Sequence, residues 1–165
     1  MRLGLLSDTH GHLERTRAAL TVLTDQHVDQ LIHCGDIGSD LVLDLLFEQH
    51  ETGTPVTLVP GNVDEWSPDI ILYARTLGFP CHQVARLNVE SHNIAVYHGH
   101  DPKQMQTLLS ESALNYIFTG HTHVARDEVV NGIRVINPGA VYRATVPSVA
   151  VLDLDEDHKL EFLEL

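Results

Sequence analysis

Five short polar segments carry side chains that bind metal ions, and they are spread over most of the chain. Each combines aspartate, asparagine or histidine with glycine: Ser7-Asp8-Thr9-His10-Gly11, Gly35-Asp36, Gly61-Asn62-Val63-Asp64, His98-Gly99-His100 and Gly120-His121-Thr122-His123. Carboxylate, imidazole and amide ligands together suit a pair of divalent first-row ions, because calcium prefers oxygen ligands and structural zinc prefers thiolates. Manganese is the first choice, with iron, zinc, nickel and magnesium as alternatives.

The spacing within two of these segments predicts paired ligands. Asp8 and His10 are two residues apart, as are His121 and His123. In extended backbone, such residues project to the same side. We therefore expect each pair to hold a metal together. Two ions ~3.5 to 4 Å apart also need a bridging ligand, and we assign this role to Asp36, whose carboxylate has two oxygens.

A charge count indicates the substrate. Two ions contribute about +4, Asp8 and Asp36 remove about 2, and a bridging hydroxide removes 1 more, leaving roughly +1 for an incoming anion. A phosphodiester monoanion matches this residual charge, and the bridging hydroxide is expected to attack phosphorus in line with the departing alcohol. A dianionic monoester would also be attracted, so phosphomonoesterase activity remains an alternative.

The segments follow predicted strands. Hydrophobic periodicity predicts helices over residues 12–26, 39–50, 70–77 and 103–112, and strands over residues 3–6, 30–34, 55–59, 83–89, 93–97, 116–119, 128–130, 133–136, 148–154 and 160–163. Strands alternating with helices in the first sixty residues favour a parallel α/β layer, whereas Asn131-Gly132 indicates a hairpin in the second half. Because ligands bind at the carboxyl ends of strands in an open α/β sheet, the polar segments should converge.

Composition limits the remaining possibilities. A length of 165 residues predicts one domain over residues 1–165. A formal charge of -13 argues against an extended nucleic-acid surface and against binding to acidic membranes. Two cysteines, Cys34 and Cys81, supply no disulfide framework, and no apolar run approaches the length of a membrane span or a signal peptide. We therefore expect a cytoplasmic protein.

Taken jointly, the five segments resemble the motifs of the calcineurin-like metallophosphoesterases, in the order found in that family. The short chain and Asn137-Pro138-Gly139 are similar to its small single-domain prokaryotic phosphodiesterases. The resemblance implies an α/β fold, a four-layer α/β/β/α sandwich of two mixed sheets flanked by helices, and a homodimer or homotetramer. It also implies two sets of metal ligands, Asp8, His10, Asp36 and His123 for one ion, and Asp36, Asn62, His98 and His121 for the other.

One position departs from the family pattern. Many members have a histidine between the asparagine and the acidic residue of the third motif, where it acts as general acid or stabilises the leaving oxygen, but here the position is Val63. Valine donates no proton, so we expect slow turnover of alkoxide leaving groups. His100 and His12 are possible substitutes. Asp64 is expected to orient a metal ligand or loop, and Asn62 to touch the phosphate as well as metal.

Other readings remain open. A binding scaffold on the same fold, resembling the retromer subunit, would also use this sandwich, but every ligand position here holds a competent residue, which favours catalysis. His33 lies in a strand and is expected to be buried and hydrogen-bonded, and Arg143 either contacts phosphate or holds a loop. The remaining histidines are expected to be solvated: His27, His50, His82, His92 and His158.

Overall fold

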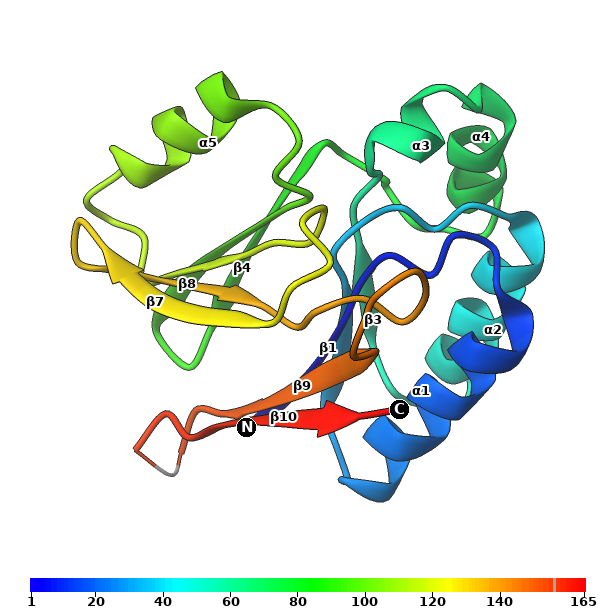
Figure 1. The fold of residues 1–165 in the computed structure, drawn as a ribbon, viewed down its shortest axis with the longest axis horizontal. Coiled ribbons are helices and arrows are strands. Elements are labelled where there is room, and N and C mark those ends of the chain that lie inside the picture. The colour runs from blue at the N-terminus through cyan, green and yellow to red at the C-terminus, as the bar shows by residue number, and fades with distance from the viewer. Residues whose placement is uncertain (156) are drawn as a thin grey trace.

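The computed structural model describes residues 1–155 and 157–165. Two five-stranded sheets pack face to face, with helices on their outer faces (Figure 1). Both sheets contain parallel and antiparallel neighbours. This arrangement confirms the predicted α/β class and the four-layer α/β/β/α sandwich.

The first sheet carries the amino-terminal half of the predicted site. Its strand order is β10 (Leu160–Glu164), β9 (Ser148–Asp153), β1 (Arg2–Leu6), β2 (Gln30–His33) and β3 (Val56–Leu58). The strands β1, β2 and β3 run parallel, as the alternation of strands and helices predicted. The carboxyl-terminal hairpin of β9 and β10 extends this sheet antiparallel to β1.

The second sheet carries the other half of the predicted site, which comes later in the chain. Its order is β4 (Val84–Val89), β5 (His92–Tyr97), β6 (Tyr116–Phe118), β8 (Ile133–Asn137) and β7 (Arg126–Val130). Two hairpins are present, β4 with β5 and the predicted one, β7 with β8. Asn131 and Gly132 have φ values of 53° and 83°, the two positive angles of a type I′ turn, so this hairpin forms for the predicted reason.

The helices follow the predicted order with altered ends. They are α1 (Leu13–Asp25), α2 (Asp40–Glu51), α3 (Asn62–Glu65), α4 (Pro68–Thr76) and α5 (Pro102–Leu109). Ser39 caps α2, since its hydroxyl accepts the Val42 N–H at 3.3 Å. The helix predicted from residue 70 begins earlier, at Pro68, because proline fits the first helical turn. The one-turn helix α3 was not predicted.

Three apolar clusters hold the layers together. The central cluster lies between the sheets and includes Leu5 from β1, Val96 from β5 and Phe118 from β6. A second cluster packs α1, α2 and α4 against the outer face of the first sheet, and a third packs α5 against the second sheet. Burial on both faces makes each sheet a rigid support for the loops that follow its strands. Among the described residues, no helix has the length and hydropathy needed to cross a membrane.

Candidate metal centre

All five polar segments emerge at the carboxyl ends of strands that share one edge of the sandwich. Asp8 and His10 follow β1, Asp36 follows β2 and Asn62 follows β3, while the second sheet supplies the histidines after β5 and β6. Two groups of side chains have potential ligand atoms within 4.8 Å of one another: Asp8, His10 and His123, and Asp8, Asp36 and His98. The convergence expected from strand order is therefore present.

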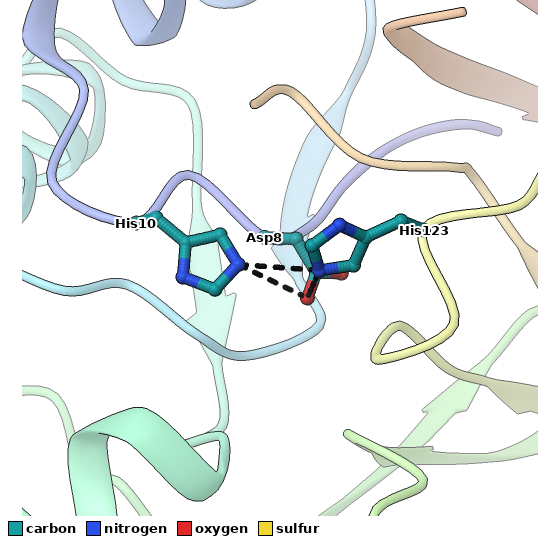
Figure 2. Close-up of side chains that lie close together, drawn as sticks. All are labelled: Asp8, His10 and His123. Atoms are coloured by element: carbon teal, nitrogen blue, oxygen red, sulfur yellow. Dashed lines mark hydrogen bonds and ion pairs between the residues drawn. The ribbon is translucent and has the colours of Figure 1, made fainter. Parts of the chain in front are cut away.

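The first group joins the two sheets through three side chains (Figure 2). His10 and His123 approach from different loops, and their Nε2 atoms lie 3.2 Å apart. Asp8 Oδ1 lies 3.1 Å from His123 Nε2 and 3.9 Å from His10 Nε2. Three electron-pair donors thus face a common point, as ligands of a small cation do.

The second group lies deeper. His98 is fully buried, and its Nε2 lies 3.4 Å from Asp36 Oδ1 and 4.0 Å from Asp8 Oδ1. The other oxygen of Asp36, Oδ2, lies 3.8 Å from His10 Nε2 in the first group. Asp36 therefore presents one oxygen to each group, which is the geometry that a bridging carboxylate requires.

Asn62 and His121 complete the set on the side of the second group. Asn62 Oδ1 lies 3.1 Å from His121 Nδ1, and the His121 ring centroid is 5.2 Å from that of His98. His121 thus lies with His98, whereas His123 lies with His10. This separation agrees with the two ligand sets that the family resemblance implies, and it does not support the expectation that His121 and His123 hold one metal together.

The extended backbone expected for the residue pairs 8/10 and 121/123 is also absent. Asp8, His10, His121 and His123 have φ values of 56°, 46°, 69° and 59°, so these residues adopt left-handed rather than extended backbone. Such conformations cost roughly 1 to 3 kcal/mol each for non-glycine residues and persist where surrounding contacts impose them. Backbone hydrogen bonds from Asp8 N to Gly35 O and from His10 N to Asp36 O, both 2.9 Å, supply such contacts here.

The ligand atoms are poorly satisfied without a cation. His98 Nδ1 lies 2.8 Å from Cys34 O and donates to it, so the lone pair of the neutral ring at Nε2 points towards two carboxylates. His98 Nε2 and Asp8 Oδ1 are both buried without a hydrogen-bond partner. A divalent cation would satisfy both atoms, because each offers an electron pair and burial of a polar atom without a partner costs free energy. The residues present therefore fit a metal centre.

The pKa values reflect this crowding. Burial lowers the pKa of His98, but the adjacent Asp36 and the charge of Asp8 outweigh it and place that pKa above its ordinary value. Burial raises the pKa of Asp36, but contact with His98 more than offsets this effect and places it below its ordinary value. Burial lowers the pKa values of His10 and His121. Neutral imidazole is the form that binds metal, so burial favours the ligand state of these two rings.

Asp64 holds a loop, one of the two roles expected for it. Its carboxylate accepts the backbone N–H groups of Ile37 at 3.0 Å, Gly38 at 2.9 Å and Gly61 at 2.8 Å. These bonds tie the loop after β2 to the start of α3 and so fix Asp36 relative to Asn62. Burial raises the pKa of Asp64 above its ordinary value, even though the three backbone N–H groups oppose this shift.

Asn137 supports the histidine loop and was not predicted to do so. It is buried at the end of β8, where its Nδ2 donates to Gly120 O at 2.7 Å and to Thr122 Oγ1 at 3.1 Å. Its Oδ1 accepts the Gly139 N–H at 2.9 Å. Its position directly after a strand was a usable signal. By contrast, no side-chain pattern could reveal the backbone carbonyl of Arg143, which lies 3.1 Å from His123 Nδ1 and orients that ring.

The two possible proton donors have different neighbours. The His100 ring is 5.6 Å from that of His98 and 6.3 Å from that of His121, and its Nε2 lies 3.4 Å from Glu65 Oε1. His12 instead caps α1 and packs against Tyr142, with the ring centroids 4.4 Å apart. His100 is therefore the better placed of the two.

Among the other histidines, the expectation for His33 is confirmed. It is fully buried, accepts the Gly35 N–H at Nδ1 and lies 3.0 Å from Thr9 Oγ1 through Nε2. The expectation that His92 and His158 are solvated is wrong. Their rings are half-buried and pack edge to face with centroids 5.0 Å apart, because His158, just before β10, lies against His92 at the start of β5.

Comparison with known proteins agrees with the fold and the motifs. The sequence profile of the calcineurin-like phosphoesterase superfamily domain matches residues 1–157. The chain is 28% identical to a phosphodiesterase of Methanocaldococcus jannaschii, over 100% of this chain and 98% of the relative. It is 31% identical to a probable metallophosphoesterase of Bacillus subtilis, over 95% of this chain and 86% of the relative.

Among solved structures, an archaeal phosphodiesterase superposes with a TM-score of 0.85 at 25% identity, and the match covers 100% of both chains. Both the sequence profile and the structural match extend over nearly the whole molecule, including all five polar segments. The chain therefore belongs to the calcineurin-like phosphoesterase superfamily.

Proposed function

We propose that this protein hydrolyses small phosphodiesters with two divalent ions held at the strand-end centre. The observation that carries the proposal is the pair of buried, unpartnered ligand atoms, Asp8 Oδ1 and His98 Nε2, at the point where the imidazoles converge. Membership of the calcineurin-like phosphoesterase superfamily supports phosphoester hydrolysis, and so does the similarity of this chain to a protein named as a phosphodiesterase.

The side chains divide between two ions. Asp8, His10, Asp36 and His123 would hold one ion, and Asp36, Asn62, His98 and His121 the other. When bound, the ions would withdraw charge from the phosphoryl oxygens and make a water molecule acidic enough to attack phosphorus. Manganese remains the proposed metal.

The chain itself positions these groups before substrate arrives. Asp64 fixes the loops of Asp36 and Asn62, and Cys34 O and Arg143 O set which nitrogen of His98 and His123 faces inward. Such fixed orientation lowers the reorganisation needed during reaction. Val63 donates only its backbone N–H, at 2.9 Å to Asp36 Oδ1, so its side chain supplies no proton to the leaving group.

Metal analysis and an activity assay on the same protein test this proposal. Purified protein loaded with Mn²⁺ should hold two ions per chain and hydrolyse bis(4-nitrophenyl) phosphate faster than 4-nitrophenyl phosphate. Asp36→Ala should lose at least one ion and nearly all activity, because both groups share this carboxylate. Asp25→Ala, an exposed aspartate at the end of α1, is the matched control and should change neither quantity.

The outcomes separate the alternatives. Stoichiometric metal without hydrolysis of either ester would favour a binding scaffold. Faster hydrolysis of the monoester would favour a phosphomonoesterase. Full activity in Asp36→Ala would contradict its bridging role.

A further inference from the structure

An apolar groove adjoins the metal centre on the side of His123. It has a volume of about 400 Å³, and its lining includes Val124, Val146 and Phe162 together with Thr145, Ser148 and Glu164. These three apolar side chains are 64%, 51% and 40% exposed. His123 lines the groove and also belongs to the first ligand group, so the two spaces share this residue.

The strand order explains why the groove lies beside the centre. Because β9 runs antiparallel to β1, the start of β9 lies at the carboxyl end of β1, from which Asp8 and His10 emerge. Because β10 runs antiparallel to β9, Glu164 pairs with Ser148 at that same edge. Phe162 and Glu164 are thus brought next to the site by the last strand of the chain.

The orientation of the His123 ring is fixed by its neighbours. His123 Nδ1 is bound to Arg143 O at 3.1 Å, while its Nε2 faces Asp8. The ring therefore keeps its Nε2 edge towards the ligand group. A phosphate bound at the metal centre would have the groove beside its ligand His123.

We propose that the groove binds an uncharged, apolar ester group of the phosphodiester, aromatic or branched aliphatic, which stays on the phosphate during hydrolysis. This assignment rests on the proposed function, since it presumes phosphate at the metal centre. A diester carries two ester groups and loses one, so the retained group needs a place of its own.

The chemistry of the groove selects this occupant. The described residues that line it include neither lysine nor arginine, and Glu164 adds a negative charge, so a second phosphate would be repelled. Internal linkages of a polynucleotide are therefore poor substrates. The volume lies in the range of small-molecule sites, ~300 to 1,000 Å³. The eight described residues that line the groove are far fewer than the ~20 residues that a stable protein interface needs on each side.

Two diesters with the same leaving group test the proposal by kinetics. Phenyl 4-nitrophenyl phosphate and methyl 4-nitrophenyl phosphate both release 4-nitrophenolate, so only the retained group differs. Burial of one ring predicts that kcat/KM is roughly tenfold or more higher for the phenyl ester. Phe162→Ala and Val146→Ser should each lower this ratio severalfold. Val129→Ser, on the exposed face of β7 outside the groove, should leave the ratio unchanged.

An equilibrium measurement separates this proposal from the proposed function. Phenylphosphonate should bind Mn²⁺-loaded protein roughly tenfold more tightly than methylphosphonate by calorimetry, and Phe162→Ala should remove most of the difference. If neither diester is hydrolysed but this binding difference holds, the groove assignment stands and the hydrolase proposal fails.

Two results would overturn the assignment. One is active enzyme whose phenyl-to-methyl ratio is the same in wild type and Phe162→Ala. The other is sedimentation showing that Phe162→Ala dissociates an oligomer while the ratio stays constant, since the groove would then be covered by a second copy of the chain.

Discussion

At the scale of single residues, the centre combines strained backbone with unsatisfied ligand atoms. Five of the seven proposed ligands have positive φ: Asp8, His10, Asp36, His121 and His123. The strain is imposed by backbone hydrogen bonds between loops and is typical of functional sites. The same loops bury His33 and Asp64, whose hydrogen bonds hold the ligand-bearing backbone without themselves facing the centre.

His33 predicts a specific loss of stability in acid. Burial lowers the pKa of His33 from 6.5 to about 3, so the unfolded chain takes up a proton below pH 6.5 that the folded chain refuses. Stability should therefore fall as pH decreases from 6.5 towards 3. From pH 7.5 to 5, this group alone should remove about 2 kcal/mol from the free energy of unfolding.

Urea unfolding of metal-free protein at the two pH values measures the effect. His33→Gln should be less stable at pH 7.5 by roughly 1 to 3 kcal/mol, because it loses part of the buried hydrogen-bond network. It should, however, show a pH dependence smaller by about 2 kcal/mol. Equal pH dependence in both proteins would contradict a neutral His33 in the folded state.

Val63 predicts a dependence on the leaving group. Val63→His should raise turnover of diesters with alkyl leaving groups, since an imidazole beside Asn62 could protonate the departing oxygen. Rates for 4-nitrophenyl esters should change little, because that leaving group needs no proton. Comparing kcat for an alkyl and an aryl ester measures this. An unchanged alkyl rate would show that His100 or solvent already supplies the proton, or that protonation is not limiting.

At the scale of elements, the loops after β2 and β3 are packed together with no room for a further side chain. A Cβ at Gly61 would lie 2.1 Å from Asp36 Oδ1 and 2.3 Å from Asp36 N. A Cβ at Gly120 would similarly lie 2.0 Å from Ser7 Oγ. These glycines let the loops of different strands approach closely enough for the ligands to meet.

Gly61→Ala should therefore damage the metal centre more than the fold. Its φ of -103° suits alanine, so the effect comes from displacement of Asp36 and not from backbone strain. Metal content and activity should fall at least tenfold while the circular dichroism spectrum remains native. Gly53→Ala is the control: its φ of 105° strains alanine, but nothing lies within 4 Å of its Cβ position, so that variant should lose some stability and keep its metals. Normal metal content in Gly61→Ala would contradict this close approach.

At the scale of the whole molecule, the centre lies across the two sheets. Asp8, His10, Asp36 and Asn62 come from the first sheet, and His98, His121 and His123 from the second. Bound ions would thus add links between the layers that the central apolar cluster already joins. Binding to the folded chain alone stabilises it, by about 2.7 kcal/mol when free metal is a hundred times its dissociation constant.

Chelation should consequently lower the melting temperature. For a chain of this length, the loss predicts a decrease of roughly 5 to 10 °C when Mn²⁺ is replaced by EDTA. Differential scanning calorimetry measures the shift. Asp36→Ala should show a much smaller one, because its shared ligand is gone. An equal shift in that variant would place the stabilising metal elsewhere.

The order of the elements and the identity of the residues that meet follow from the amino-acid sequence alone. Periodicity predicts each strand, and Asn131-Gly132 predicts a hairpin. The polar segments are expected at one edge because parallel strands end on the same side of a sheet. These features depend on local patterns that the residues carry with them.

How the side chains face one another depends on long-range contacts in the folded chain. The left-handed backbone at Asp8 and His121, the short helix α3, and the separation of His121 from His123 all arise from hydrogen bonds between loops far apart in sequence. The apolar groove likewise exists because β10 returns to the edge next to β1. Local sequence patterns do not predict such contacts, since each contact depends on a partner from another part of the chain.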